Sequence, residues 1–276
     1  MSDLLISAKT LADHLDDENT VIVDCRFQLN DPEAGRNAYE QDHIPGAVYF
    51  DLDKDMSGPV REHGGRHPLP NPKEFVKKLE MAGIDANVRV VAYDDENGAF
   101  AARFWWMLNY FGHENGFVLD VGYSTWKKEG YPTSSEIPYP KPAVFKANVR
   151  REMAVGIEEV KQRQQEDEVV LIDSRAPARY RGEHEPIDRK AGHIPGAVNR
   201  FWKENIGPDG KWKPIAQLRE RFTDDDAKEY IVYCGSGVTA AANALALQAV
   251  GKKVRLYVGS WSDWSSYDEN PVETGE

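Results

Sequence analysis

The chain contains, at residues 230–250, the stretch YIVYCGSGVTAAANALALQAV. Its first four residues are aromatic or β-branched, which favours a buried strand, and residues 239–250 are rich in Ala and Leu, which favours a helix. Cys234 stands where the predicted strand ends. In sheets built from such units, ligands bind at the carboxyl ends of the strands. Cys234 is therefore expected at the edge of a sheet where a site would form.

The loop after Cys234 has the composition expected around a reactive thiolate. Gly235 and Gly237 allow the backbone to curl tightly, so that several N–H groups point at the sulfur. The N-terminus of the following helix adds partial positive charge, and both effects favour the thiolate over the thiol. The alternative is a structural cysteine in a strand-to-helix turn, where a Gly-x-Gly pair has little purpose. We therefore predict that Cys234 is a nucleophile.

Four motifs recur in the same order at a nearly constant offset, which indicates a duplicated domain. The matched pairs are residues 20–26 (TVIVDCR) and 169–175 (VVLIDSR), 43–48 and 193–198 (both HIPGAV), 90–94 and 231–234, and 120–126 and 258–264. The last residue of the third motif is a cysteine only in the second copy, where it is Cys234; the first copy has Asp94. A carboxylate cannot act as the thiolate nucleophile predicted for Cys234, so only the second copy is expected to be catalytic.

Within each copy, short β-branched runs alternate with amphipathic stretches. This alternation predicts an α/β fold of two tandem domains, each a mainly parallel sheet flanked by helices. Residues 1–131 are the first, inactive domain, residues 132–146 a proline-rich linker, and residues 147–276 the second, catalytic domain. The predicted helices cover residues 11–15, 72–82, 99–111, 157–164, 214–222 and 239–250.

Composition excludes several other classes of protein. The 34 basic and 46 acidic residues give a formal net charge of -12, which argues against a nucleic-acid partner. No apolar run is long enough to span a bilayer, and residues 1–10 lack the features of a signal peptide, so we predict a cytoplasmic protein without a membrane partner. Cys25 and Cys234 lie far apart without Cys-x-x-Cys spacing, which indicates neither a disulfide framework nor a metal site.

The sequence CGSGVT at residues 234–239 resembles the active-site loop of the two-domain sulfurtransferases of the rhodanese superfamily, in the form of the 3-mercaptopyruvate branch. The resemblance covers nearly the whole chain and implies two rhodanese-like domains. It implies that Cys234 takes sulfane sulfur from 3-mercaptopyruvate as a persulfide and releases pyruvate. The acceptors it implies are cyanide or a thiol such as that of thioredoxin, and it implies no metal and no organic cofactor.

The resemblance also implies which arginines bind the donor's carboxylate. The family's carboxylate-binding arginine falls on Arg179. A second arginine is expected shortly before His193, where Ile187 is nearest the expected position and Arg189 follows two residues later. Arg189 is therefore the second candidate. A guanidinium suits this task because it can donate two parallel hydrogen bonds to a carboxylate.

The remaining implied site residues are a proton relay and the loop itself. Ser236, His67 and Asp53 fall on the positions of a relay like that of serine hydrolases, which would help proton transfer around the donor. The loop residues expected to hold the transferred sulfur are Gly235, Gly237, Val238 and Thr239.

Three alternative functions remain. A thiosulfate sulfurtransferase tends to carry Arg and Lys after the cysteine to bind a dianion, whereas Gly235 and Ser236 are neutral. A non-catalytic rhodanese-like interaction module would have lost Cys234. A cysteine phosphatase has a loop one residue longer that ends in an arginine, where this chain has Ala240. The first of these is the strongest competitor.

Overall fold

The computed structural model describes residues 4–223 and 227–276, and it divides the chain into two compact units. The described residues of the first unit are 4–58, 69–150 and 206–212. Those of the second unit are 59–68, 151–205, 213–223 and 227–276.

Two segments belong to the unit that the repeat does not predict for them. Residues 59–68 follow the first unit in sequence but pack in the second, and residues 206–212 pack in the first. In the second unit, the N–H of Gly64 donates to Asp263 Oδ1 (2.7 Å). Neither segment contributes a strand to a sheet, so the strand pattern contained no information about where it packs.

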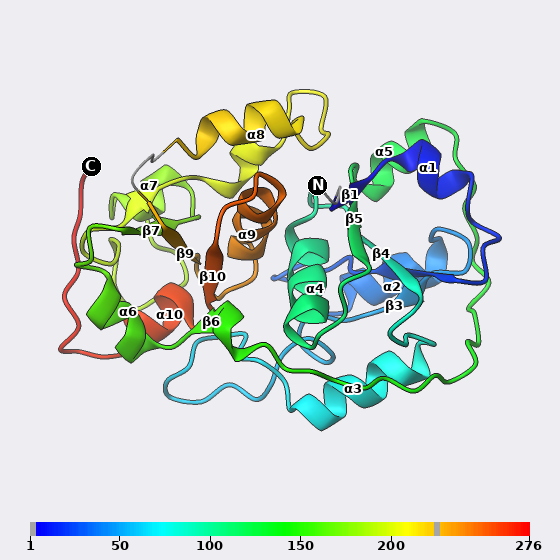
Figure 1. Ribbon diagram of the computed structural model, residues 1–276, viewed down its shortest axis with the longest axis horizontal. Coiled ribbons are helices and arrows are strands. Elements are labelled where there is room, and N and C mark those ends of the chain that lie inside the picture. Colours follow the sequence, from blue (N-terminus) through cyan, green and yellow to red (C-terminus); the bar gives the residue numbers. More distant parts are fainter. Residues whose placement is uncertain (1–3, 224–226) are drawn as a thin grey trace. The chain divides into compact units, whose positions relative to one another are not determined.

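The first unit is built on a five-stranded parallel sheet with the strand order β1-β5-β4-β2-β3 (Figure 1). Its strands are β1 (Leu5–Ile6), β2 (Thr20–Asp24), β3 (Val48–Tyr49), β4 (Arg89–Tyr93) and β5 (Gly116–Leu119). Because all strands run in the same direction, their carboxyl ends lie at one edge of the sheet. Asp94 directly follows the central strand β4 at this edge.

The second unit repeats this sheet with the order β6-β10-β9-β7-β8. Its strands are β6 (Ala154–Val155), β7 (Val169–Asp173), β8 (Val198–Asn199), β9 (Glu229–Tyr233) and β10 (Val254–Tyr257). Cys234 directly follows the central strand β9, as Asp94 follows β4. The predicted α/β fold with parallel sheets is therefore confirmed.

Helices connect the strands in both units. The first unit has α1 (Ala8–Ala12), α2 (Ala34–Gln41), α3 (Pro72–Met81), α4 (Ala99–Tyr110) and α5 (Tyr123–Lys128). The second has α6 (Ile157–Arg163), α7 (Pro177–Tyr180), α8 (Ile215–Arg221), α9 (Ala240–Ala249) and α10 (Ser260–Trp264), with 3₁₀ turns η1 (Arg151–Met153) and η2 (Trp202–Asn205). α4 packs against β4 and β5, and α9 packs against β9 and β10 (Figure 1).

Five of the six predicted helices agree with the structure to within one residue at each end, and the first does not. That helix was expected at residues 11–15 but is α1, which begins at Ala8. The Oγ of Ser7 accepts a hydrogen bond from the N–H of Thr10 (3.1 Å) and so begins the helix earlier. The prediction relied on apolar residues and overlooked this N-cap.

The two copies are stabilised by matched buried contacts. Trp126 and Trp264 are fully buried and donate their indole N–H groups to backbone carbonyl groups at 2.8 Å, those of Pro132 and Pro271. Arg175 pairs with the fully buried Asp173 at the end of β7. The same pair occurs in the first unit as Arg26 with Asp24, which shows that Arg175 belongs to the scaffold of the repeat.

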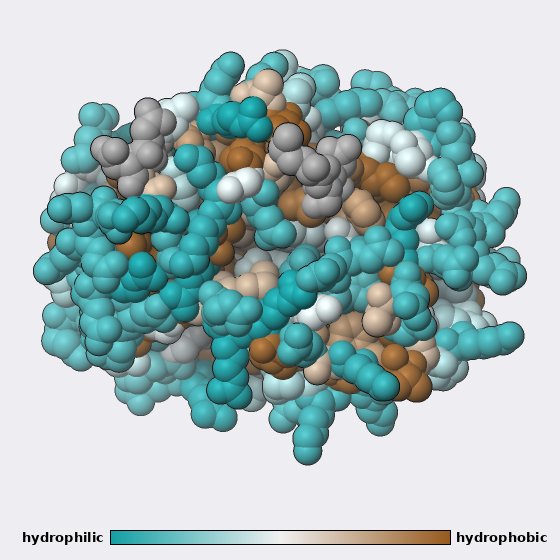
Figure 2. Space-filling view, viewed as in Figure 1, coloured by the Kyte–Doolittle hydropathy of each residue, from teal (hydrophilic) through white to brown (hydrophobic). Residues whose placement is uncertain are grey.

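The face seen in Figure 2 is mostly hydrophilic, with apolar residues scattered across it. Among the described residues, no helix combines the length and the apolar character needed to cross a bilayer.

Candidate active site

Cys234 lies at the junction of the central strand and the N-terminus of a helix. It follows β9 directly, and its side chain is nearly inaccessible, with the residue 2% exposed. α9 begins at Ala240, and the side chain of Thr239 at its N-cap makes no capping hydrogen bond in this described helix. The positive end of the α9 dipole therefore faces the loop and is not capped by the Thr239 hydroxyl. Ala240 is fully buried, so the site where phosphatases have an arginine is part of the core.

Hydrogen bonds from the start of α10 fix the backbone of the loop. The N–H of Cys234 donates to Ser260 Oγ (3.1 Å), and Ser260 Oγ in turn donates to Tyr257 O (2.8 Å). The N–H of Trp261 donates to Cys234 O (3.0 Å), and the N–H of Ser262 donates to Gly235 O (2.9 Å). The loop is therefore held on one side by a rigid element, which leaves the side chain of Cys234 in a defined position.

The two loop glycines are required for different reasons. Gly237 has φ +75°, and a Cβ added there would lie 2.3 Å from Val258 O, so any side chain is both strained and in collision with the backbone. A Cβ on Gly235 would lie 3.0 Å from Arg66 Nη2 and 3.4 Å from Arg179 Nη1. Gly235 therefore provides the space in which two guanidinium groups approach the loop.

Arg179 and Arg66 reach the loop from different parts of the second unit. Arg179 is on the short helix α7, which begins at Pro177, a residue suited to the first position of a helix. Its Nε and Nη2 donate to Glu185, and Nη2 also donates to Asp188 Oδ2 (2.9 Å). Arg66 comes from the segment 59–68 and pairs with Asp188 Oδ1. Asp188 thus bridges the two arginines.

The carboxylates that pair with these arginines are buried, and their pKa values are shifted in opposite directions. The side chains of Glu185 and Asp188 are 3% and 4% exposed. The pKa of Glu185 is lowered because hydrogen bonds from Arg179 and from two backbone N–H groups outweigh its burial. Burial raises the pKa of Asp188, although Arg66 acts in the opposite direction.

His67 and Ser236 form a direct hydrogen bond in the second unit. His67 Nδ1 lies 2.7 Å from Ser236 Oγ, and both residues are buried. Ser236 is two residues beyond Cys234, so the pair belongs to the loop that begins at the cysteine. An imidazole bound to a hydroxyl at this distance can pass a proton in either direction.

The segment that carries Arg66 and His67 is fastened to α10 and the residues after it. The N–H of Arg66 donates to Ser262 Oγ (3.1 Å). Ser266 Oγ donates to Asp263 O (2.7 Å) and lies 2.7 Å from His63 Nδ1, which therefore supplies the proton for the second bond. The ring of His63 stacks on that of Tyr267, with centroids 3.8 Å apart. These contacts explain how a segment without a strand is positioned at the site.

In the first unit, a carboxylate occupies the position of the sulfur. Asp94 accepts hydrogen bonds from the N–H groups of Glu96, Gly98, Phe100 and Ala101, at 2.7–2.9 Å. The loop and the start of α4 therefore form an anion-binding nest, which the protein fills with its own carboxylate. The equivalent loop of the second unit has a cysteine in place of that carboxylate.

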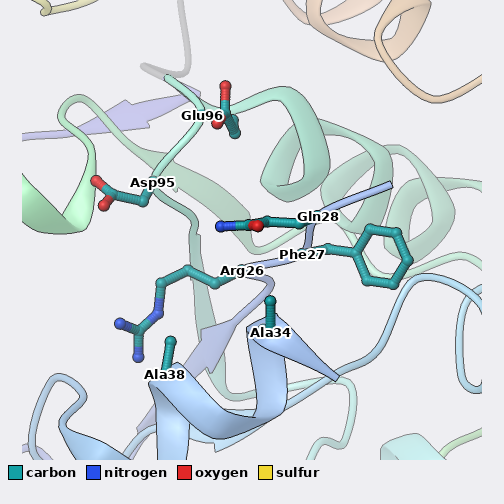
Figure 3. Close-up of a pocket in the computed structure, with 8 residues that line it drawn as sticks. Arg26, Phe27, Gln28, Ala34, Ala38, Asp95 and Glu96 are labelled. Carbon is teal, nitrogen blue, oxygen red and sulfur yellow. The ribbon is translucent and has the colours of Figure 1, made fainter. Parts of the chain in front are cut away.

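A cavity of about 140 Å³ lies at this same edge of the first sheet (Figure 3). Its lining includes Arg26, Gln28, Ala38 and the acidic residues Asp95 and Glu96. Ala38 precedes Tyr39 on α2 as Arg179 precedes Tyr180 on α7. The hydroxyls of these two tyrosines donate to equivalent carbonyl groups, at 2.8 and 2.7 Å. At the equivalent positions the first unit therefore has neither the thiol nor the arginine.

Replacing Asp94 by alanine is expected to destabilise the first unit, because N–H groups at the start of α4 lose their acceptor. An unpaired buried donor costs about 1–3 kcal/mol. Urea denaturation followed by circular dichroism should show a clear fall in the free energy of unfolding. The variant Asp94→Asn keeps one acceptor oxygen, so its free energy of unfolding should lie between those of the wild type and Asp94→Ala.

The same residue is expected to make stability depend on pH. Burial raises the pKa of Asp94 to about 6, although the N–H groups oppose this. Because the folded-state pKa of Asp94 lies above the unfolded value, the neutral carboxyl adds to the free energy of unfolding at low pH. This contribution is lost as the pH rises through about 6. Asp94→Asn should lack this loss, and identical pH profiles for the two proteins would contradict the assignment.

The structure places the other predicted site residues as follows. Asp53 belongs to the first unit, in the turn after β3, where its N–H donates to Asp51 Oδ1 (2.9 Å); its role in a relay with His67 stays a prediction. The side chain of Arg189 is 69% exposed and lies 3.9 Å from Asp268. The residues of this segment that contact Arg179 are acidic, Glu185 and Asp188.

Sequence reasoning missed Arg66 and Asp188. Arg66 was overlooked although it precedes the predicted His67 directly, because only the histidine fell on a position of the expected relay. Asp188 was not predicted because the family resemblance implies a cation, not a carboxylate, in that segment. The available signal was the departure of residues 185–190 from the family's spacing.

Comparison with known proteins agrees with this geometry. The rhodanese-like domain matches residues 7–129 and 156–267. A probable 3-mercaptopyruvate sulfurtransferase of Pseudomonas aeruginosa is 41% identical over 279 residues, which cover 99% of this chain and 98% of the relative. A putative thiosulfate sulfurtransferase of Mycobacterium tuberculosis is 37% identical over 279 residues, which cover 99% and 97%. The structure of a 3-mercaptopyruvate sulfurtransferase from Leishmania major has a TM-score of 0.85 at 29% identity and covers 98% of this chain and 76% of that chain.

The chain belongs to the rhodanese-like domain family. The family and the sulfurtransferase class predicted from the sequence are thereby confirmed. The names of the relatives include both donors, 3-mercaptopyruvate and thiosulfate, so they do not choose between them.

Proposed function

We propose that this sulfurtransferase takes its sulfur from 3-mercaptopyruvate and carries it as a persulfide on Cys234. The observation that carries the proposal is the hydrogen bond of 2.7 Å between His67 and Ser236 beside the cysteine loop. A thiol donor brings a proton that must be moved during the reaction, and this pair is suited to move it.

In the first step, the thiolate of Cys234 attacks the sulfur of the donor. A sulfur–sulfur bond forms, and the bond between that sulfur and C3 of the donor breaks, with its electron pair leaving on pyruvate enolate. Ser236 and His67 take the thiol proton and return it to C3, so that pyruvate leaves and no proton is gained or lost overall. The N–H groups of the loop and of the start of α9 stabilise the charge on the outer sulfur.

In the second step, a nucleophilic acceptor attacks the outer sulfur. The new bond forms to that sulfur, and Cys234 departs with the electron pair as the thiolate. Gly235 and Ser236 are neutral, so they carry no negative charge that would repel an incoming thiolate or cyanide. We propose a thiol acceptor, of which thioredoxin is one candidate, and a cytoplasmic location in which the two unpaired cysteines stay reduced.

The carboxylate of the donor is proposed to bind between Arg66 and Arg179. One nitrogen of each guanidinium lies close to the space beside Gly235, as the distances of 3.0 and 3.4 Å indicate. Two guanidinium groups that approach one point bind a carboxylate with charge-assisted hydrogen bonds. Arg66 takes the part that the sequence had given to Arg189.

The direct test compares the two donors under the same conditions. With cyanide as acceptor, kcat/KM for 3-mercaptopyruvate is expected to exceed that for thiosulfate. Equal or greater efficiency with thiosulfate would overturn the choice of donor while leaving sulfur transfer intact.

Replacing Ser236 by alanine is expected to lower kcat for 3-mercaptopyruvate by roughly a hundredfold, within the range of general acid–base contributions. Thiosulfate should be affected much less, because its outer sulfur brings no proton and sulfite leaves as an anion. Steady-state kinetics with both donors measure the difference. Equal losses for both would show that the serine only shapes the loop.

The pair can be tested as a unit with a double variant. If His67 acts through Ser236, His67→Gln combined with Ser236→Ala should lose little more than the single variants. Fully multiplicative losses would mean that the two residues act independently.

A further inference from the structure

Asp188 is a buried acidic residue at the point where a cation was expected. Its two oxygens accept hydrogen bonds from different arginines, Oδ2 from Arg179 Nη2 (2.9 Å) and Oδ1 from Arg66 Nη1. Its N–H donates to Glu185 Oε1 (3.1 Å), which fixes the turn that presents it. With a side chain 4% exposed, the carboxylate is almost fully withdrawn from water.

The guanidinium nitrogens closest to the loop are ones that Asp188 does not bind. Asp188 binds Nη1 of Arg66 and Nη2 of Arg179. The atoms nearest to a Cβ placed on Gly235 are Nη2 of Arg66 (3.0 Å) and Nη1 of Arg179 (3.4 Å), followed by Nη2 of Arg179 (3.6 Å). The carboxylate therefore holds one terminal nitrogen of each guanidinium group and orients the other terminal nitrogen toward the donor.

The charges of this cluster balance before any donor binds. Three guanidinium groups face three carboxylates, and the members are Arg66, Arg175, Arg179, Asp173, Glu185 and Asp188. A bound monoanion brings the sum to minus one and a bound dianion brings it to minus two. Because Coulomb energy is proportional to charge, the carboxylate of Asp188 opposes a dianion about twice as strongly as a monoanion at the same distance.

We propose that Asp188 is a specificity-determining residue, which positions Arg66 and Arg179 and cancels one of their charges, so that the donor site favours a monoanionic carboxylate over a dianion. The inference rests on the proposed function, since it assumes that the donor binds between these arginines. It adds a residue that sets the choice between the two donors.

The test is the ratio of kcat/KM for thiosulfate to kcat/KM for 3-mercaptopyruvate. In Asp188→Asn, which removes the charge and keeps the shape, this ratio should rise by roughly tenfold, the effect of one charge in a partly screened site. In Asp188→Glu, which keeps the charge and moves it, both efficiencies should fall while the ratio stays near that of the wild type. A charge effect and a merely structural effect are thereby separated, because damage to the fold would lower both donors alike.

A matched control is Asp268→Asn, which removes a charge at a position that is 90% exposed in the same unit. It should leave the ratio unchanged. An unchanged or lower ratio in Asp188→Asn, or the same rise in Asp188→Glu, would overturn the inference. If the wild type does not use 3-mercaptopyruvate at all, the proposed function fails instead, and that outcome is visible before any variant is made.

Discussion

Cys234→Ser is expected to abolish sulfur transfer from both donors, a loss of at least about a thousandfold. Serine fits the same loop but has no sulfur to form the persulfide. Incubation of the wild-type protein with donor should add one sulfur atom to the intact mass, and cyanide should remove it. The variant should show neither event in the same mass spectrometry experiment.

The matched control is Cys25→Ser, because Cys25 is fully buried in the first unit. Burial raises the pKa of Cys25 well above its ordinary value, and the nearby Asp24 acts in the same direction, so this thiol stays protonated and inert. Activity per folded molecule should be retained. Normal turnover by Cys234→Ser, or a mass increase that moves with Cys25, would falsify the mechanism.

Replacing Arg179 by glutamine is expected to lower kcat/KM for 3-mercaptopyruvate by roughly tenfold to several hundredfold. This corresponds to the loss of a charge-assisted interaction of roughly 1.5–3 kcal/mol with the donor's carboxylate. Arg66→Gln should cause a loss of the same order, because both guanidinium groups adjoin Gly235. In the double variant, the loss of transition-state stabilisation should differ from the sum of the two single losses, because both arginines pair with Asp188.

The thermal stability of the variants should be measured together with these kinetics, because Glu185 and Asp188 are buried and lose a partner in Arg179→Gln. Arg189→Gln serves as the comparison, and its exposed side chain predicts kinetics close to the wild type. Unchanged kinetics in Arg179→Gln would remove Arg179 from the site. A large loss in Arg189→Gln would return Arg189 to it.

The two-fold repeat made much of the fold predictable. Motifs such as HIPGAV fix turns through local backbone geometry, and five helices followed from apolar periodicity. The prediction of α1 was wrong at both ends, and a single hydroxyl, that of Ser7, decided its start. The short helix α7 was not predicted, although it carries Arg179, because four residues are too few for a periodic pattern.

The sequence by itself determined the duplicated α/β fold, the family and the cysteine at the end of the central strand of the second unit. These features depend on periodicity and on motifs that are contiguous in the chain. Only the tertiary structure decided that residues 59–68 pack in the second unit and bring Arg66 to the loop. The approach of the neighbouring His67 to Ser236 was already implied by the family resemblance. It also decided that Asp188 bridges the two arginines. Such contacts join residues far apart in the sequence, and their geometry depends on how loops without strands pack, which no local pattern encodes.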